Sequence, residues 1–323
     1  MGKQTEKDNL FSVDVENLEI IEDNGKESIR AKVIKECMRL ATGNPIIGTK
    51  IQMGELQRKW MEKEPAWHAP DSMRWEEISL NHFTLESLIP DRKGEKIVLQ
   101  LHGGGYVNPI KNVYRNFAKK YAEMGDGMGV YSPDYRVAPE HTYPAALLDV
   151  ITSYEYILRQ GHLARNIIVA GDSAGGGLAV ALCMWLQAHH RELPSKLVLM
   201  SPWLDMTASG ESYDRNFDKD PMFGGTRESM IYRRDYAGDY DIRDPYLSPL
   251  YGDFNGMPEM LIQAGEIEML RSDAESAAKA MEDVGGKVSL QIYKGMFHVF
   301  QMGLEQIPES AKAWEEVEKF ILS

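Results

Sequence analysis

The chain alternates short runs of apolar residues with longer segments in which apolar positions recur every three or four residues. The apolar runs lie at residues 97–101, 128–131, 167–170, 197–200, 260–264 and 288–293. The segments with helical periodicity lie at residues 114–124, 145–158, 178–189 and 273–284. A strand that is apolar along its whole length has both faces covered, as in a parallel sheet flanked by helices. The pattern therefore predicts an α/β fold with a mostly parallel central sheet.

The residues before this alternating pattern are typical of helices. Four apolar positions fall at helical spacing, and they are Ile29, Val33, Cys37 and Leu40. Gly43 follows them as a plausible helix stop, and a second helix is expected from Leu56 through Trp60 towards Pro65. From Trp75 the period changes, which predicts paired strands before the turn residues at 91–94. The N-terminal part of the chain is therefore expected to be mainly helical, ahead of the sheet.

One segment interrupts the alternation later in the chain. Residues 207–243 contain no clear strand pattern and are rich in charged residues, Gly, Met and Tyr, which predicts an insertion above the sheet. We expect one structural domain with a cap. Its N-terminal cap helices and lead-in occupy residues 1–70, its α/β core occupies residues 71–206 and 244–323, and the cap insertion occupies residues 207–243.

Composition and charge disfavour some classes of binding partner. The chain has 36 basic and 49 acidic residues, for a net charge of −13, which disfavours binding to nucleic acid or to an anionic membrane surface. Residues 1–9 are polar and charged, with no apolar signal-peptide core, and no apolar run reaches the ~18 residues of a membrane span. Cys37 and Cys183 are far apart, so free thiols are favoured over a disulfide. The expected location is the cytoplasm.

The sharpest chemical signal is Gly-Asp-Ser-Ala-Gly at residues 171–175, directly after an apolar run and before a helical segment. A serine on a tight strand-to-helix turn is the arrangement of a hydrolase nucleophile. Side chains at Gly171 and Gly175 would collide with neighbouring backbone in so sharp a turn. A loop serine with flexible glycines is the alternative, but the strand and helix on either side favour Ser173 as a nucleophile.

A second signal is His-Gly-Gly-Gly at residues 102–105, which follows the apolar run at 97–101. Consecutive glycines leave backbone amides free to approach a substrate and to stabilise an oxyanion. The same triplet is also found in flexible connections and in phosphate-binding loops, although no Lys-Ser/Thr pair follows to make a P-loop. His102 is expected to hold this loop through hydrogen bonds of its ring.

A catalytic base and acid are expected after the nucleophile in chain order. His298 lies in a loop beyond the last apolar run, and the other histidines stand at less suitable positions. The acid must follow the run at 260–264, where three carboxylates are available. Asp273 is typical of the first turn of a helix, and Glu266 is expected to face solvent. The third carboxylate is Glu268.

Several motifs together resemble the hormone-sensitive lipase family of α/β-hydrolases, in particular its bacterial esterases. They are His-Gly-Gly-Gly at 102–105, Asp-Tyr-Arg-Val-Ala-Pro-Glu at 134–140, Pro-Ala-Ala at 144–146, Gly-Asp-Ser-Ala-Gly at 171–175, Ser-Pro-Trp at 201–203, Asp-Pro-Tyr-Leu-Ser-Pro at 244–249 and Phe-His-Val-Phe at 297–300. The resemblance covers residues 96–323 and is weak before residue 70. It implies the α/β-hydrolase fold, with Ser173 as nucleophile and His298 as base.

The resemblance also favours Glu268 as the acid. In this family the acid usually stands as Asp-Pro-Leu after a strand-closing glycine, and the matching residues here are Glu-Met-Leu at 268–270 after Gly265. Glutamate is one methylene longer than aspartate, so the departure changes the geometry of this loop. The oxyanion-hole amides implied by the family are those of Gly104, Gly105 and Ala174.

The expected function is hydrolysis of short- to medium-chain carboxylic esters through an acyl-enzyme, without a metal or other cofactor. The expected substrate is a small-molecule ester. The candidates for lining a cap pocket are Tyr106, Trp203, Met222, Phe223 and Tyr232, and for each the alternative is packing of the cap onto the core. A homodimer through an edge strand or the C-terminal helix is also compatible with the sequence.

Two other classes of function are compatible with this fold. One is a catalytically silent small-molecule receptor, similar to the plant gibberellin receptor, which lacks the catalytic histidine. The presence of His298 disfavours this reading. The other is an amidase or peptidase that uses the same three residues, which the sequence neither favours nor excludes.

Overall fold

A central sheet carries the fold in the computed structural model, which describes residues 19–21, 27–44, 46–56 and 64–323. Within these residues the strands form one nine-stranded sheet in the order β1-β9-β8-β7-β6-β4-β5-β3-β2. The strands are β1 (Glu19–Ile21), β2 (Met73–Leu80), β3 (Phe83–Pro90), β4 (Ile97–Leu101), β5 (Gly129–Asp134), β6 (Ile167–Asp172), β7 (Lys196–Met200), β8 (Glu259–Gly265) and β9 (Val288–Tyr293). Neighbours from β1 to β5 are parallel, and β3 pairs antiparallel with β5 and β2. The predicted, mostly parallel α/β sheet is confirmed.

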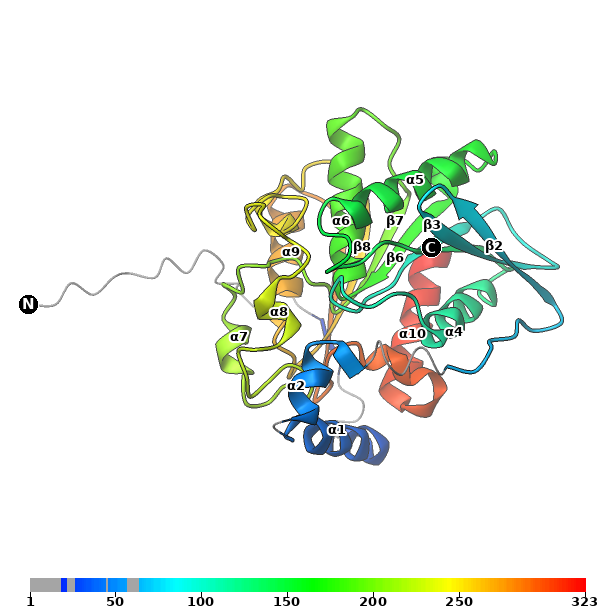
Figure 1. The fold of residues 1–323 in the computed structure, drawn as a ribbon. Helices are drawn as coiled ribbons and strands as arrows, with labels where there is room; N and C mark the ends of the chain where they lie inside the picture. Colours follow the sequence, from blue (N-terminus) through cyan, green and yellow to red (C-terminus); the bar gives the residue numbers. More distant parts are fainter. Residues whose placement is uncertain (1–18, 22–26, 45, 57–63) are drawn as a thin grey trace, which may run out of the picture.

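Helices pack on both faces of the sheet (Figure 1). The α-helices are α1 (Ile29–Thr42), α2 (Ile47–Gln52), α4 (Asn112–Ala122), α5 (Ala145–Arg159), α6 (Ala174–Ala188), α7 (Ser212–Arg215), α8 (Met230–Arg233), α9 (Arg271–Asp283) and α10 (Pro308–Leu322). Short 3₁₀ helices are η2 (Ala164–Asn166), η3 (Pro249–Tyr251) and η4 (Phe300–Gln306). Residues of α5, α6 and α9 share one hydrophobic cluster with the sheet, and residues of α4 and α10 share another.

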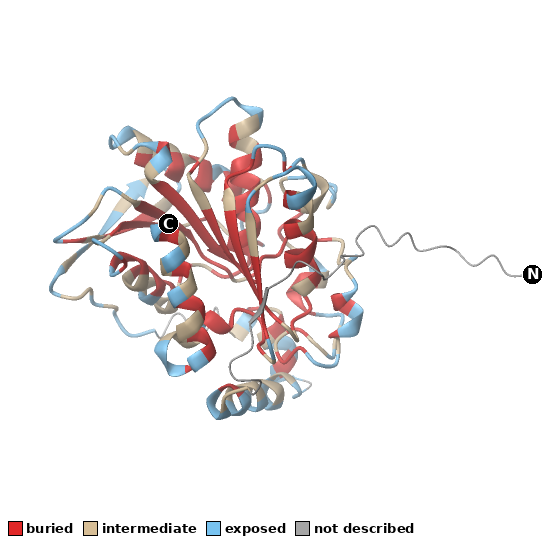
Figure 2. Ribbon diagram, turned by 180° about the vertical axis from the view of Figure 1, so that it is seen from behind, coloured by how far each residue is buried: buried red, intermediate tan, exposed pale blue. Residues whose placement is uncertain are grey.

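The side chains of each central strand alternate between these two hydrophobic clusters. In β4, Ile97, Leu99 and Leu101 belong to the cluster on the α5 and α6 side, whereas Val98 belongs to the cluster on the α4 and α10 side. Successive side chains of a strand point to opposite faces, so a strand covered on both sides is mostly apolar. Figure 2 shows these strands as the buried centre of the molecule. The six predicted apolar runs all form strands of this sheet.

Helix α6 shows where periodicity misplaces a boundary. The apolar pattern predicts a helix over 178–189, but α6 begins at Ala174. Its first turn contains Gly175, Gly176 and Gly177, which contribute no hydrophobic side chain to the pattern and have low helix propensity. The added turn is tolerated because its glycines are buried against neighbouring backbone, so tertiary packing overrides local preference.

The N-terminal helix forms where the spacing predicts it, but its apolar positions face outward. Ser28 caps α1 by accepting a hydrogen bond from the amide of Ala31, and Gly43 ends it. The side chains of Ile29 and Leu40 are 80% and 78% exposed, whereas Ala31 is buried among residues of the chain's C-terminal part. The second helix predicted through Leu56 and Trp60 lies mostly outside the described residues, and α2 precedes it.

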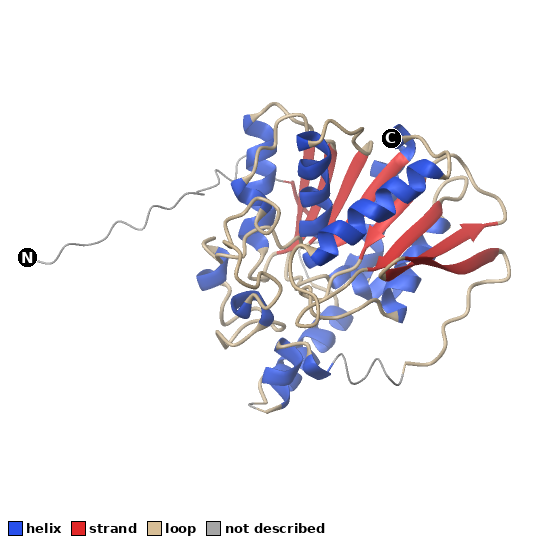
Figure 3. Ribbon diagram, turned by 45° about the horizontal axis from the view of Figure 1, so that its top comes forward, coloured by secondary structure: helices blue, strands red, loops and turns tan. Residues whose placement is uncertain are grey.

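The N-terminal helices and the predicted insertion lie side by side, below and to the left of the sheet in Figure 1. Residues 207–243, all of which the structure describes, form α7, α8 and turns but no strand, as Figure 3 shows. Thr42 Oγ1 donates to the carbonyl of Pro221 at 2.9 Å, and Gln52 Nε2 donates to the carbonyl of Gly224 at 3.0 Å. These contacts join two segments that are distant in sequence.

Candidate active site

Three predicted site residues follow three strands of the parallel sheet. Ser173 follows β6, Glu268 follows β8 and His298 lies in the loop after β9. The carboxyl ends of parallel strands meet at one edge of the sheet, which is where α/β folds place their sites. The topology therefore brings side chains that are up to 125 residues apart to a single place.

Ser173 occupies a strained turn between β6 and α6. Its backbone has φ 51° and ψ −120°, a conformation that a non-glycine residue rarely adopts. A Cβ on Gly171 would lie 2.3 Å from the carbonyl oxygen of Gly175, and a Cβ on Gly175 would lie 2.1 Å from that of Leu101. Both glycines are therefore required by close backbone contacts.

The three side chains form a continuous hydrogen-bonded chain. Ser173 Oγ lies 3.0 Å from His298 Nε2, and His298 Nδ1 lies 2.9 Å from Glu268 Oε2. The other carboxylate oxygen of Glu268 accepts the amide of Gly265 at 2.8 Å. Glu268 is fully buried, and Ser173 and His298 are each 6% exposed. A buried carboxylate in this position selects the imidazole tautomer that carries a proton on Nδ1 and leaves Nε2 free to accept the hydroxyl proton.

The two other candidate acids have different partners. Glu266 Oε2 accepts the amide of Gly295 at 2.9 Å, so this side chain is partly buried rather than turned to solvent as predicted. Asp273 lies in the first turn of α9 as expected, and its Oδ2 accepts the amides of Leu204 and Asp205. Burial raises the pKa of Asp273 well above its usual value. Of the three carboxylates, Glu268 is the one that contacts His298.

The Glu-Met-Leu loop has a contact that the usual family sequence lacks. The amide of Met269 donates to Asp220 Oδ2 at 2.8 Å. Proline, which the family usually has at this position, carries no N–H and cannot make this bond. The departure from the family pattern thus adds a hydrogen bond between the loop that carries Glu268 and the segment at 207–243.

The glycine loop after β4 presents backbone amides beside Ser173. Gly104 and Gly105 have φ of 112° and 64°, in the left-handed region that favours glycine. Within the described residues, the amides of Gly104, Gly105 and Ala174 donate to no other group of the protein. The preceding amide, that of Gly103, donates to Asp172 Oδ1 at 3.0 Å. The loop is thus held at one amide while the next two remain available to a ligand.

His102 is a structural part of this loop. Its ring stacks on Tyr135 with centroids 4.0 Å apart, and its Nδ1 lies 2.8 Å from the carbonyl oxygen of Gly103. Complete burial lowers the pKa of His102 to about 3, so the imidazole is neutral at physiological pH. A neutral ring enclosed in this way holds the loop through its contacts with Gly103 and Tyr135.

A cavity of about 160 Å³ opens beside the serine. Met222 and Phe223 line it, as predicted, and they come from the segment at 207–243. Tyr106 and Trp203 do not line it, which corrects the prediction for both residues. Tyr106 has φ 60°, which turns its ring into the core, where it stacks on Tyr236 at 4.2 Å. The predicted pocket residue Tyr232 also lies outside this lining.

The similarity of this chain to known proteins identifies its family. The family model described as alpha/beta hydrolase fold matches residues 98–302. An acetyl-hydrolase of Streptomyces hygroscopicus is 33% identical over 246 residues, which cover 76% of this chain and 81% of that protein. A solved structure of an esterase from the bacterial hormone-sensitive lipase family is also 30% identical to this chain. The chain belongs to the hormone-sensitive lipase family of α/β-hydrolases.

Two solved structures extend the similarity to almost the whole chain. The crystal structure of an esterase from the bacterial hormone-sensitive lipase family is 30% identical, with a TM-score of 0.78, and covers 92% of this chain and 98% of that one. The crystal structure of EstE5 soaked with p-nitrophenyl butyrate is 31% identical, with a TM-score of 0.81, and covers 91% of this chain and 98% of that one.

This family member also has polar cavity residues that the sequence analysis missed. Asn108 and Lys111 line the cavity, and Asn108 Oδ1 is buried with no hydrogen-bond partner among the described residues. Burial lowers the pKa of Lys111 to about 8. These residues follow the glycine loop in a stretch without regular periodicity, so no sequence signal pointed to them. The remaining lining residues that were not predicted are Tyr114, Asp172, Met230, Val299 and Met302.

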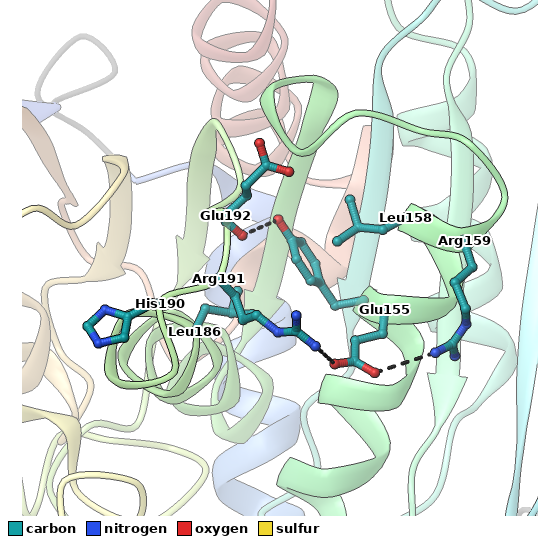
Figure 4. A pocket seen from close by; sticks show the side chains of 8 residues that line it. Glu155, Leu158, Arg159, Leu186, His190, Arg191 and Glu192 are labelled. Carbon is teal, nitrogen blue, oxygen red and sulfur yellow. Dashed lines mark hydrogen bonds and ion pairs between the residues drawn. The ribbon is translucent and has the colours of Figure 1, made fainter.

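A larger cavity of about 340 Å³ lies elsewhere on this hydrolase, between the C-terminal ends of α5 and α6 (Figure 4). Arg191 and Arg159 approach Glu155 from two sides there, at 3.1 and 3.5 Å. Helix α6 starts beside Ser173 and extends for 15 residues, which places its far end roughly 20 Å away. Size alone therefore does not identify the reaction site, because the smaller cavity contains the serine and the histidine.

The buried carboxyl of Asp172 is expected to make the folding stability of this hydrolase depend on pH. Burial raises its pKa to about 7, compared with ~3.9 in an unfolded chain. The stability that this carboxyl contributes is therefore fully present below about pH 4 and is lost as the pH rises through 7. Asp172→Asn removes the titration, and the amide can still accept from Gly103 and bond to the hydroxyl of Tyr114.

Thermal unfolding at pH 5 and pH 8 tests this expectation. The melting temperature of the Asp172→Asn variant relative to the native protein should be higher at pH 8 than at pH 5. The difference between the folded and unfolded pKa values of Asp172 corresponds to at most roughly 4 kcal/mol of folding free energy. An equal difference at both pH values would mean that the carboxyl does not titrate in this range.

Proposed function

We propose that this carboxylic ester hydrolase uses Ser173 as nucleophile, His298 as general base and Glu268 as the acid that orients the imidazole. The observation that carries the proposal is the pair of contacts at His298, 3.0 Å to the serine hydroxyl and 2.9 Å to the carboxylate. A nucleophile, a base and an orienting acid in hydrogen-bond reach are the requirements of nucleophilic acyl transfer.

The reaction begins when the carbonyl carbon of a bound ester approaches Ser173 Oγ. His298 Nε2 accepts the hydroxyl proton as the C–O bond forms, and Glu268 stabilises the resulting imidazolium. The imidazolium then gives its proton to the leaving alcohol oxygen, and the acyl group stays on the serine. Water activated by the same imidazole attacks the acyl-enzyme and releases the carboxylic acid.

The negative charge on the carbonyl oxygen requires donors that are already in place. The amides of Gly104, Gly105 and Ala174 fit this role because they have no other acceptor within the described part of the chain. Preorganised donors of this kind are worth about 10²–10³ in rate each. Ala174 is also the first residue of α6, so the helix dipole favours negative charge at the same point.

The cavity favours a small acyl group. Its volume of about 160 Å³ is close to the ~150 Å³ of an apolar cavity that accommodates benzene. Apolar side chains contribute much of its wall, namely Met222, Phe223, Met230 and Met302. The names of the similar proteins, an acetyl-hydrolase and an esterase soaked with p-nitrophenyl butyrate, fit the same size class. We therefore assign short-chain carboxylic esters as the substrates.

A p-nitrophenyl ester series from acetate to palmitate measures this limit. kcat/KM is expected to be highest for acetate and butyrate and to fall by at least about 10-fold at octanoate, because a longer chain exceeds the cavity volume. Equal or rising values up to palmitate would contradict the assignment to short acyl chains, although the ester hydrolase assignment would stand.

The alternative functions predict different outcomes. A silent receptor on this fold would bind ligand but would form no covalent adduct with a fluorophosphonate, and the contact of His298 with Ser173 disfavours it. An amidase would turn over amides at least as well as matched esters, which parallel assays on the two substrate types decide.

The N-terminal helices and the segment at 207–243 together form the proposed cap on a core of residues 71–206 and 244–323. Their mutual hydrogen bonds and the presence of Met222 and Phe223 in the cavity wall support this division. No helix in the described part of the chain is long and apolar enough to cross a bilayer. A cytoplasmic location and a homodimer stay predictions from the sequence.

A further inference from the structure

The loop that carries Glu268 is attached to the segment at 207–243 by side-chain hydrogen bonds to its backbone. Asn216 Nδ2 donates to the carbonyl of Glu268 at 2.8 Å and to that of Glu266 at 3.1 Å. Asp220 Oδ2 accepts the amide of Met269 at 2.8 Å. The loop is thus held by groups on both sides of the carboxylate-bearing residue.

Ser212 extends the same set of contacts along the loop. Its Oγ donates to the carbonyl of Met269 at 2.5 Å and accepts the amide of Ser272 at 2.8 Å. In return, the amide of Ser212 donates to Ser272 Oγ at 2.8 Å. Because one buried hydroxyl satisfies a carbonyl of the loop and an amide in the first turn of α9, its loss would leave both without a partner.

The three side chains are spaced four residues apart and lie on one side of a helical stretch. The amide of Asn216 donates to the carbonyl of Ser212, and the amide of Asp220 donates to the carbonyl of Asn216, each at 2.9 Å. Residues four apart in such a stretch face the same direction. All three are buried: Ser212 completely, Asn216 at 2% exposure and Asp220 at 5%. We call these residues the acid-loop clasp.

Asp220 also links the clasp to the imidazole. Its second oxygen, Oδ1, accepts the amides of Met222 at 2.7 Å and Phe223 at 3.1 Å. The ring of Phe223 packs edge-on against His298, with centroids 4.9 Å apart. One carboxylate therefore holds the residue next to Glu268 and the aromatic ring that contacts the base.

Glu268 itself has few means of keeping its position. Its carboxylate bonds to the amide of Gly265 and to His298, and its side chain has three rotatable bonds. A displacement of about 1 Å in a catalytic group costs on the order of 10²-fold in rate. The backbone on either side must therefore be fixed by other residues, and the clasp provides this support.

We infer that Ser212, Asn216 and Asp220 are positioning residues, through which the segment at 207–243 sets the placement of Glu268 and His298. This inference rests on the proposed function of these two residues. The segment at 207–243 then has two roles, since it lines the cavity with Met222 and Phe223 and also holds the catalytic acid in place.

Variants of the clasp separate positioning from general stability. Asn216→Ala removes both bonds to the loop carbonyls, and Asp220→Asn replaces one acceptor oxygen with an NH₂ group. Asp205→Asn is the matched control, because Asp205 is 2% exposed and accepts the amides of Thr207 and Ser209 in the same segment. With p-nitrophenyl acetate, kcat is expected to fall about 10–100-fold in the two clasp variants, with KM within about 3-fold of the native value. In Asp205→Asn, kcat should stay within about 2-fold.

A double-mutant cycle with Glu268→Gln shows whether the clasp acts through the acid. If it does, Asn216→Ala should change kcat by less than about 2-fold in the Glu268→Gln background, since the effects of coupled residues do not add. Asp220→Asn should keep part of its effect there, because Asp220 also holds Phe223 against His298. The same factor for Asn216→Ala in both backgrounds would overturn the inference. An unchanged kcat in both clasp variants, or an equal loss in the Asp205→Asn control, would also overturn it.

A spectroscopic measurement keeps the test independent of activity. The proton on His298 Nδ1 that is shared with Glu268 should give a strongly downfield imidazole resonance in the native protein, identified by its loss in Glu268→Gln. This resonance should weaken or shift in Asn216→Ala and Asp220→Asn and persist in Asp205→Asn. Its persistence in folded clasp variants contradicts the clasp, whereas absence of ester hydrolysis by the native protein contradicts the proposed function instead.

Discussion

Replacing Ser173 with alanine is expected to lower kcat for p-nitrophenyl acetate by about 10⁵–10⁶ and to leave the fold intact. The substitution removes the oxygen that lies 3.0 Å from His298 Nε2, so no acyl-enzyme can form. Alanine keeps the Cβ that the strained turn already accommodates, and therefore adds no new steric conflict. Residual hydrolysis would come from the oxyanion donors and binding alone.

A matched serine provides the control for this experiment. Ser310 is fully buried and donates from Oγ to the carbonyl of Gln301, outside the cavity lining. Ser310→Ala should lose some stability and retain kcat within about 2-fold. A fluorophosphonate should label the native protein and Ser310→Ala but not Ser173→Ala. Hydrolysis or labelling that survives in Ser173→Ala would show that another residue is the nucleophile.

The central sheet and the turn at Ser173 were predictable because each leaves a local signal in the sequence. A strand buried on both faces is a mostly apolar run, as β4 illustrates with the boundaries that the sequence predicted. The turn at Ser173 excludes side chains at Gly171 and Gly175, so these two positions appear as glycines in the sequence. In both elements the physical constraint acts on residues that are neighbours in the chain.

The direction of the aromatic side chains near the site and of the apolar side chains of α1 was not predictable in this way. Tyr106 and Trp203 are large aromatics near the site, but the structure buries them in the core outside the cavity. Helix α1 has apolar residues at helical spacing, yet Ile29 and Leu40 face solvent. Which way these side chains point depends on tertiary contacts with distant segments. Periodicity does not encode those contacts.

The clasp was missed for a related reason. Ser212, Asn216 and Asp220 lie in a segment with no strand and little apolar pattern, and each residue type is common in ordinary surface turns. Their significance comes from partners 49 to 60 residues further along the chain. A polar side chain that satisfies a distant backbone group leaves no signal at its own position. Only the folded arrangement relates it to Glu268.

The choice between carboxylates is the part of the site that mutagenesis tests most directly. Glu268→Gln keeps the length of the side chain but removes the negative charge that stabilises the imidazolium. kcat is expected to fall by about 10³–10⁴, with KM within about 3-fold, because loss of the charge and of the correct tautomer affects the transition state more than binding. Steady-state kinetics on p-nitrophenyl acetate measures both parameters.

Two further substitutions decide whether the length and the position of this carboxylate matter. Glu268→Asp withdraws the carboxylate by about 1.5 Å, so it cannot reach both His298 Nδ1 and the amide of Gly265, and kcat should fall about 10–100-fold. Glu266→Gln should change kcat by less than about 3-fold, since its amide oxygen can still accept from Gly295. A larger loss in Glu266→Gln than in Glu268→Gln would transfer the role of acid to Glu266, because the variant that removes the imidazolium's counter-charge must be the slower one.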